Sequence, residues 1–470
     1  MEPRAVSIVA TGSANLASVR RAVERRGHLA IVTDDPHDVV ASPRLILPGV
    51  GAFGAAMKEL AARGLVEALQ HRLLGGMPTL CICLGMQLLC ESSEESPGVR
   101  GLGVVPGHIT RFAAGEGVRV PQLGWNLVTP TGDGMFMEPG WAYYANSYRL
   151  AEAPAGWNVA VSEHGGPFIG AMQRGGVLAC QFHPELSSTW GSELIGRWLD
   201  GTPALSTGAL RTSARKPPVS RVIPCLDVAN GRVVKGVRFA NLRDMGDPAT
   251  MAAAYESQGA DELVMLDVCA TIESRRAAVA TVQAVRRSVS IPVTVGGGVA
   301  TVDDAKALLD VGADKVAINS AAVQDPALIA RLATRFGRQC VVVAIDAARD
   351  ASRPGDHWNV VVRSGRERTS LDVVEWAREA ASRGAGEVLL TSRDRDGTRD
   401  GYDLALLEAV CGGVEIPVIA SGGAHSPDHL AAALASGASA VLAASIFHEA
   451  EYTVGHIKAA LSSRGMEVRS

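Results

Sequence analysis

Short apolar, β-branched runs alternate with Ala-rich amphipathic stretches along most of the chain, a pattern typical of an α/β protein. After residue 220 this pattern predicts eight strands, each followed by helix-like sequence. The predicted strands are Val222–Asp227, Glu262–Asp267, Pro292–Gly296, Lys315–Ser320, Cys340–Asp346, Glu387–Ser392, Pro417–Ser421 and Ala440–Ser445. Eight strands that alternate with helices over about 250 residues predict a closed (β/α)8 TIM barrel.

An internal repeat divides the predicted barrel into two halves. Residues 291–321, IPVTVGGGVATVDDAKALLDVGADKVAINSA, resemble residues 416–447, IPVIASGGAHSPDHLAAALASGASAVLAASIF. A strand also ends in an Asp near the start of each half, at Asp227 and at Asp346. Functional residues should therefore occupy equivalent positions in both half-barrels.

The first 204 residues predict a separate α/β domain of the doubly wound kind. Its expected parallel strands are Ala5–Ala10, Ala30–Thr33, Arg44–Leu47 and Pro78–Cys83, with added antiparallel strands between Gly103 and Phe182. Residues 205–219 are polar and basic, contain a Pro pair and lack apolar periodicity, so they are interpreted as a linker. A chain of 470 residues exceeds one ordinary core of ~250–300 residues, and we expect two domains, 1–204 and 220–470.

Composition and charge indicate which classes of molecule and which compartment suit this protein. A net charge of −4 and a pI near 6.3 give no electrostatic footprint for nucleic acid. The longest apolar run, residues 77–90, is too short to span a bilayer, and the start of the chain lacks the pattern of a signal peptide. Eight scattered Cys predict reduced thiols in a cytoplasmic protein, and without His/Cys zinc spacing we expect no metal and no cofactor.

The clearest candidate for nucleophilic chemistry is Cys83. A buried strand runs into it, Gly85 follows, and an apolar helix begins, so the thiol would stand on a tight strand–helix turn. By itself this segment favours a buried structural Cys over a nucleophile. His183 and Glu185 lie two apart in a run expected to be extended, which would place both side chains on one face. His183 could then take the Cys83 proton while Glu185 orients the imidazole, as in a catalytic triad.

The motifs PGVG (48–51), CLGMQLL (83–89) and QFHPE (181–185) resemble those of class I glutamine amidotransferases. The GWN of 124–126 and the SY of 147–148 narrow the resemblance, over residues 5–200, to the glutaminase of the imidazole glycerol phosphate synthase family. The resemblance implies Cys83 as nucleophile, His183 as base and acid, Glu185 as its orienter, Gly49 and Gly51 in the oxyanion-forming strand and Gln87 in glutamine binding.

Four places depart from the family pattern. Cys81 stands where the family has Gly, Gln122 and Asn146 stand where it has His, and residues 10–16 read ATGSANL in place of DYGxGNL. These changes leave open whether glutaminase activity is weakened.

Asp227 and Asp346 would face each other across the barrel mouth, where this fold places its chemistry. Such a pair suits general acid–base work, although strand-end Asp residues also cap helices. Gly-rich segments occur in both halves, at 296–298 in the first and at 396–397 and 421–423 in the second, together with the segments 319–320 and 444–445. Their exposed N–H groups suit phosphate, which predicts a substrate with one phosphate at each end.

Residues 223–239, 294–299, 312–323, 342–347 and 389–403 closely resemble the cyclase of the same family, over about residues 220–470. The resemblance implies Asp227 and Asp346 as the acid/base pair and Lys235 on a loop that closes over the substrate. The other implied substrate-binding residues are Gly298, Asn319, Thr391, Asp396, Gly397, Gly423 and Ser445. The implied substrate is the bis-phosphorylated ribulosyl formimino-aminoimidazole carboxamide ribonucleotide, which ammonia converts to imidazole glycerol phosphate and aminoimidazole carboxamide ribonucleotide.

Charged residues begin four of the predicted barrel strands. They are Arg221, Glu262, Lys315 and Glu387. Alternation predicts that Arg221, Lys315 and Glu387 point inward, because they share parity with Asp227, Asn319 and Thr391. Buried charges need partners, and two bases can pair with two acids. The resemblance implies a gate for ammonia, whereas a plug that only seals the barrel floor fits the sequence equally well.

The leading hypothesis is a bifunctional enzyme with small-molecule substrates, glutamine and a bis-phosphorylated ribonucleotide. One chain carries both activities, so a monomer would suffice. Two alternatives remain: an ammonia-dependent cyclase with an impaired glutaminase domain, and a metabolite-binding or scaffold protein without turnover.

Overall fold

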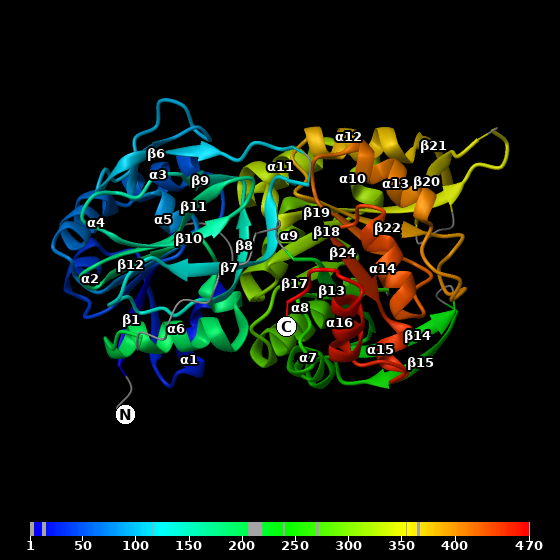
Figure 1. Cartoon of the computed structure of the whole chain (residues 1–470), viewed down its shortest axis with the longest axis horizontal. Coiled ribbons are helices and arrows are strands. Elements are labelled where there is room, and N and C mark those ends of the chain that lie inside the picture. Colours follow the sequence, from blue (N-terminus) through cyan, green and yellow to red (C-terminus); the bar gives the residue numbers. More distant parts are fainter. Residues whose placement is uncertain are drawn as a thin grey trace. The chain divides into compact units, whose positions relative to one another are not determined.

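The computed structural model describes residues 4–11, 16–115, 117–204, 219–237, 240–268, 272–353, 355–363 and 367–469. The chain divides into two compact units, with the boundary between residues 218 and 219 (Figure 1). Residues 205–218 of the expected linker lie outside the described residues, as do residues 12–15 of the ATGSANL segment. Over the described residues, no helix has both the length and the apolar character needed to cross a bilayer.

Unit 1 is built on a nine-stranded mixed sheet in the order β2-β1-β3-β4-β12-β11-β10-β7-β8. Its parallel part comprises β1 (Ala5–Val9), β2 (Leu29–Thr33), β3 (Leu45–Leu47), β4 (Thr79–Ile82) and β12 (Val177–Cys180). Its antiparallel part comprises β7 (Gln122–Pro130), β8 (Gly140–Asn146), β10 (Asn158–Glu163) and β11 (Pro167–Arg174). The predicted α/β class with added antiparallel strands is thus confirmed.

Within the described residues, a small second sheet and seven helical segments complete unit 1. The sheet pairs β5 (Cys90–Ser93), β6 (Val105–Arg111) and β9 (Tyr148–Leu150). The helices are α1 (Leu16–Arg25), α2 (Pro36–Ala41), α3 (Phe53–Ala62), α4 (Leu65–Leu74), α5 (Leu84–Gln87), α6 (Ser188–Asp200) and the 3-10 turn η1 (Pro184–Leu186).

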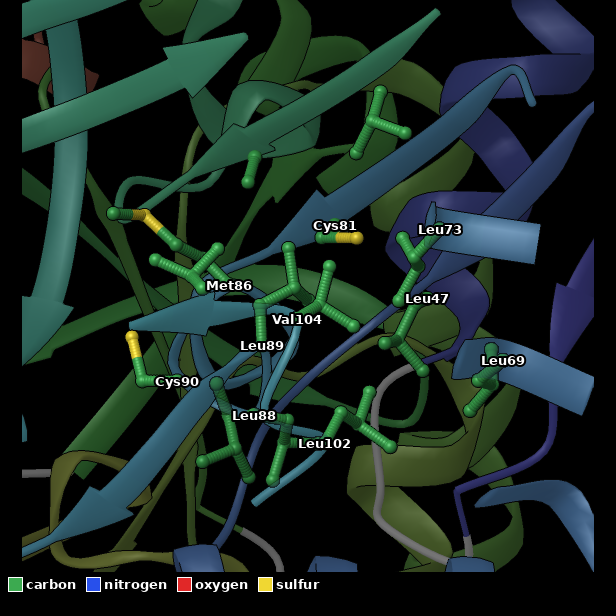
Figure 2. Close-up of a cluster of buried hydrophobic side chains, with 14 of the residues drawn as sticks. Leu47, Leu69, Leu73, Cys81, Met86, Leu88, Leu89, Cys90, Leu102 and Val104 are labelled. Carbon is green, nitrogen blue, oxygen red and sulfur yellow. The ribbon is translucent and has the colours of Figure 1, made fainter. Parts of the chain in front are cut away.

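Alternation along β4 assigns its side chains to two different cores. Leu80 and Ile82 pack in one cluster, whereas Cys81 packs in the other with Leu47 of β3 and with Leu69 and Leu73 of α4 (Figure 2). The two clusters hold the sheet between helical layers, so the end of β4 is fixed from both sides. This fixed end carries Cys83.

Unit 2 is a closed barrel of eight parallel strands, as predicted. The strands are β13 (Arg221–Ala229), β16 (Leu263–Asp267), β17 (Val293–Gly296), β18 (Lys315–Ile318), β19 (Val341–Arg349), β22 (Glu387–Ser392), β23 (Val418–Ser421) and β24 (Ala440–Ala443). Pairing of β24 with β13 closes the barrel. Small and apolar side chains such as Ile223, Val264 and Ala317 fill its interior.

The helices of unit 2 follow the strands in turn. They are α7 (Pro248–Ser257), α8 (Ile272–Ser288), α9 (Val302–Val311), α10 (Ser320–Gln324), α11 (Ala327–Phe336), α12 (Val373–Ser382), α13 (Leu404–Gly413), α14 (Pro427–Ala435), α15 (Ser445–His448) and α16 (Val454–Ser463), with the 3-10 turn η2 (Arg338–Cys340). Several begin at side-chain caps, including Asp247 before α7, Asp372 before α12 and a Thr301–Asp304 capping box at α9.

Two antiparallel extensions were not predicted. After β13 the chain forms β14 (Arg232–Val237) and β15 (Ala240–Gly246), and after β19 it forms β20 (Trp358–Val362) and β21 (Glu367–Asp372). The expectation that Asp227 and Asp346 end their strands is therefore wrong. Both strands continue because their last residues pair with the extensions, and the two Asp lie two and three residues before the strand ends.

Candidate active sites in the two units

Cys83 sits on a strained turn between β4 and α5. Its backbone has φ 50° and ψ −105°, a region that side-chain-bearing residues rarely adopt and that costs about 1–3 kcal/mol. The surroundings impose this conformation, because the Cys83 N–H donates to the Cys180 carbonyl at 2.7 Å. A Cβ at Gly85 would lie 2.2 Å from the Leu47 carbonyl oxygen, so only Gly fits beside β3. The turn is therefore a close-packed elbow that carries the thiol.

His183 and Glu185 form a buried pair beside the thiol. The His183 Nδ1 lies 2.8 Å from the Glu185 Oε1, and the two side chains are 6% and 4% exposed. Burial by itself would lower the pKa of His183, but the charges of Cys83 and Glu185 and the hydrogen bonds to them raise that pKa well above its ordinary value. The imidazole is thus held ready to carry a proton next to the sulfur.

The predicted reason for the His183–Glu185 contact is wrong, although the two side chains do meet. The segment is not extended: His183 is followed by the 3-10 turn η1, Pro184–Leu186. This tight turn folds Glu185 back toward the imidazole. The Pro184 ring, whose fixed φ suits the first position of a helical turn, favours that conformation over a strand.

The segment with Gly49 and Gly51 packs directly against the elbow. A Cβ at Gly49 would lie 2.2 Å from the Gly85 nitrogen, and Gly51 has φ 106°. The Leu84 N–H, which follows the nucleophile, points to the Gly49 carbonyl at 3.4 Å. In this conformation the carbonyl oxygen of Gly49, and not its N–H, faces the Leu84 amide.

The departures from the family pattern occupy different surroundings. Cys81 lies in the core beside α4, in the cluster that does not contain Cys83. Burial raises its pKa far above the ordinary range of a thiol, which makes it inert. Gln122 and Asn146 are buried directly opposite each other on β7 and β8. The Asn146 Nδ2 donates to the Tyr148 carbonyl at 3.0 Å, close to Gln87, which donates to the same carbonyl at 3.1 Å.

At the mouth of the barrel a cavity of about 550 Å³ collects many of the predicted cyclase residues. It is lined by Asp227, Lys235, Asp346, Thr391, Asp396, Gly397, Gly423 and Ser445. Among the described residues, Gly298 and Asn319 do not line it. Asn319 instead donates from Nδ2 to the Asp346 Oδ2 at 3.2 Å. The structure thus gathers both carboxylates with the Gly-rich turns of the second half-barrel, and Asn319 holds one carboxylate.

Both carboxylates are poised to exchange protons near neutral pH. Burial and the negative charge of Asp396 raise the pKa of Asp227 to about 6, against the opposing effect of Lys235. Burial and Asp396 likewise raise the pKa of Asp346 to about 6, against the effects of Arg393 and Asn319. A matched pair of buried carboxyls in one cavity can supply and remove protons at neighbouring positions on a ligand.

Sequence reasoning missed several residues of this cavity. Arg243, Arg393, Arg399, Cys225 and Glu449 also line it. The Arg393 N–H donates to the Ala347 carbonyl at 2.8 Å, which fixes the Arg393 backbone one residue from Asp346. Proximity in sequence could have indicated Arg393 and Arg399, which lie near Thr391 and Asp396, and Cys225, which lies two residues before Asp227. Only the fold brings Arg243 and Glu449 to the mouth.

Arg221, Glu262, Lys315 and Glu387 form a closed ring of ion pairs inside the barrel. Arg221 bonds to Glu262 at 2.8 Å and also to Glu387, and Lys315 reaches Glu262 at 2.6 Å and Glu387 at 2.7 Å. All four side chains are buried. Burial alone would raise the pKa of Glu387, but Arg221 and Lys315 together hold it below its ordinary value. The two cations thus favour the charged form of Glu387 in the barrel floor.

Two family models match the chain, one in each unit. The model of the class-I glutamine amidotransferases matches residues 8–199, and the model described as histidine biosynthesis protein matches residues 221–453. The first match contains Cys83, His183 and Glu185, and the second contains Asp227 and Asp346. Across the described ranges, no group of three or more His, Cys, Asp or Glu side chains could hold a metal ion.

Proposed function

This chain joins a class-I glutamine amidotransferase domain to a domain of the histidine biosynthesis protein family, and on that premise we propose that it is a bifunctional imidazole glycerol phosphate synthase. Unit 1 hydrolyses glutamine and unit 2 uses the ammonia. The observation that carries the proposal is the presence of two complete constellations in one chain. They are the Cys83–His183–Glu185 set on the elbow of unit 1 and the Asp227–Asp346 pair in the barrel mouth.

In the proposed glutaminase reaction, the Cys83 thiolate attacks the carboxamide carbon of glutamine. His183 gives its proton to the departing nitrogen, ammonia leaves, and a thioester remains. His183 then takes a proton from water, which hydrolyses the thioester to glutamate and restores the thiolate. The raised pKa of His183 and its 2.8 Å contact with Glu185 support this role, because the imidazole must hold a proton at neutral pH. They also favour an active glutaminase over an impaired one.

In the proposed cyclase reaction, the cavity binds the bis-phosphorylated ribonucleotide across the mouth of the barrel. Ammonia attacks this substrate, the imidazole ring closes, and the aminoimidazole carboxamide ribonucleotide leaves. Asp227 and Asp346 move the protons, which their pKa values near 6 support. The cations Lys235, Arg243 and Arg399 in the lining suit the charge of the phosphates.

We further propose that the ion-pair ring in the barrel floor controls the entry of ammonia. The four charges occupy the interior at the ends of the strands opposite to the catalytic cavity. A ring in which each acid holds both bases can open by breaking only one or two pairs. A permanent plug remains the competing role.

The test of the two-site proposal is the variant Cys83→Ala. Glutamine-dependent synthesis should fall to background, because no thiolate remains to attack the amide, whereas synthesis from added ammonium salt should stay near the wild-type rate. Product formation is followed with each nitrogen source, and the inert buried thiol of Cys81 provides the matched control as Cys81→Ala. Equal loss with both nitrogen sources would refute separate sites.

A further inference from the structure

A series of side-chain amides connects Cys83 to the β8–β9 turn of unit 1. The Gln181 Nε2 lies 3.7 Å from the Cys83 Sγ, and the Gln181 Oε1 lies 3.1 Å from the Gln87 Nε2. The same Gln87 Nε2 reaches the Tyr148 carbonyl at 3.1 Å, and that carbonyl also accepts from Asn146. The buried amides thus form one continuous set of hydrogen bonds that ends at the sulfur.

The far end of this series determines which group faces the sulfur. A backbone carbonyl can only accept, so the Gln87 atom next to Tyr148 must be its NH2 group. That NH2 also faces Gln181, so the Gln181 atom opposite it must be the oxygen. The remaining Gln181 group, which faces Cys83, is then an NH2 donor. The orientation of the Gln181 amide follows from its partners.

The backbone also fixes the position of Gln181. Its side chain is fully buried, and its N–H donates to the Gly170 carbonyl at 2.8 Å. The preceding residue, Cys180, accepts the hydrogen bond from the Cys83 N–H at 2.7 Å. Cys83 and Gln181 therefore lie on segments that are hydrogen-bonded to each other, so the distance between the Cys83 sulfur and the Gln181 nitrogen can vary little.

We propose that Gln181 is a further catalytic residue of the glutaminase, which stabilises the Cys83 thiolate by donating a hydrogen bond to its sulfur. This inference rests on the proposed glutamine hydrolysis. Gln87 and Asn146 are positioning residues in it, because they reach the sulfur only through Gln181. His183 carries the proton in each step, and Gln181 transfers none.

The donor acts where the sulfur is charged. In the first step the sulfur–carbon bond forms as the carbon–nitrogen bond breaks, and in the second step water breaks the sulfur–carbon bond and the thiolate leaves. A thioester sulfur is a weak acceptor, whereas a thiolate is a strong one. The Gln181 NH2 therefore favours formation of the thiolate before the attack and its release as the leaving group in the second step, and it should affect turnover more than glutamine binding.

The variant Gln181→Met tests this inference, because Met has a similar length and no donor. We expect kcat for glutamine hydrolysis to fall ~10- to 100-fold with little change in KM, which corresponds to a lost hydrogen bond to a charged group. Alkylation of Cys83 by iodoacetamide should slow by a similar factor, and synthesis from ammonium salt should be unchanged. The matched control is Gln173→Met, since Gln173 is also buried and, among the described residues, the hydrogen bonds of its side chain go only to the 134–136 segment.

Two further variants distinguish the possible outcomes. Gln181→Glu keeps the shape of the side chain, and its ionised carboxylate repels the thiolate. Alkylation of Cys83 should therefore slow at least as much as in Gln181→Met. This variant replaces Gln181→Met if the latter does not fold. Gln87→Met should slow alkylation without contacting the sulfur, because it frees the Gln181 amide to turn. Wild-type alkylation rates in folded Gln181 variants would overturn the inference while leaving the glutaminase intact. The proposed function itself fails only if the wild-type protein releases no glutamate from glutamine.

Discussion

Replacing Asp227 with Asn should stabilise the barrel at neutral pH while it removes cyclisation. Asp227 is buried in the cavity, near the carboxylate of Asp396, and these surroundings penalise its charged form. An Asn side chain has nearly the same shape without the charge. The same burial that prepares the carboxyl for proton transfer therefore weakens the fold, and the substitution should reverse both effects.

The magnitude follows from the shift in pKa. The pKa of Asp227 rises from an ordinary value of 3.8 to about 6. Because the pKa of Asp227 is higher in the folded state, its contribution to the stability of the barrel is most favourable below pH 3.8 and is lost as the pH rises through about 6. A shift of about two units corresponds to ~3 kcal/mol, so the charged carboxyl destabilises the barrel by about that amount at pH 7.5 and by ~1 kcal/mol at pH 4.5.

The assay is calorimetry of the full chain at pH 7.5 and pH 4.5, with ammonium-driven synthesis measured beside it. Asp227→Asn should raise the melting temperature of the barrel transition by ~5–10 °C at pH 7.5 and by much less at pH 4.5. Synthesis should fall ~10²- to 10⁴-fold, and glutamine hydrolysis should persist.

The control is Asp247→Asn, because the backbone hydrogen bond from Thr250 lowers the pKa of Asp247 and the loss of its charge gives no stabilisation at pH 7.5. A melting temperature for Asp227→Asn at or below that of the wild type at pH 7.5 would refute the reasoning.

Two further predictions concern the barrel. In Lys315→Ala, Glu262 and Glu387 share Arg221 alone, so the free energy of unfolding should fall by ~3–5 kcal/mol. If the ring is a gate, this variant should also hydrolyse more glutamine than it forms product. A folded variant that still gives one product per glutamine would leave only the plug. Arg393→Met removes the cation that lowers the pKa of Asp346, so that pKa should rise above about 6. The acidic limb of the pH–rate profile for ammonium-driven synthesis should then move to higher pH. Arg393→Lys, which keeps the positive charge, should partly restore the wild-type profile. An unchanged profile in Arg393→Met would show that Arg393 does not act on the carboxyl.

Much of the fold could be predicted from local sequence. Buried parallel strands are nearly continuous apolar runs, so all eight barrel strands were located to within a few residues of their observed bounds. The two extensions, β14–β15 and β20–β21, were missed because their short segments show no regular alternation of polar and apolar residues, and their strand conformation depends on pairing with β13, with β19 and with each other. Strand ends were therefore the least certain part of the prediction.

The candidate site likewise has one part that the sequence predicted and another that only the structure shows. The sequence by itself was enough to predict candidate catalytic residues, because the proposed nucleophile, its His and Glu and the two Asp stand in short motifs. Only the tertiary structure decided how they are held. The 3-10 turn that folds Glu185 back, the Gln181 amide at the Cys83 sulfur and the guanidinium of Arg393 near Asp346 are outcomes of packing.

The ring in the barrel floor shows the physical reason most directly. Alternation along each strand could predict that Arg221, Lys315 and Glu387 point inward, and charge balance required that they pair. Neither could predict that each acid bonds to both bases, and alternation gave no inward direction for Glu262, which precedes β16. The pairs link residues 41 to 166 positions apart. Side-chain direction is a local property of the backbone, whereas partners, burial and pKa values are set by the closure of the barrel.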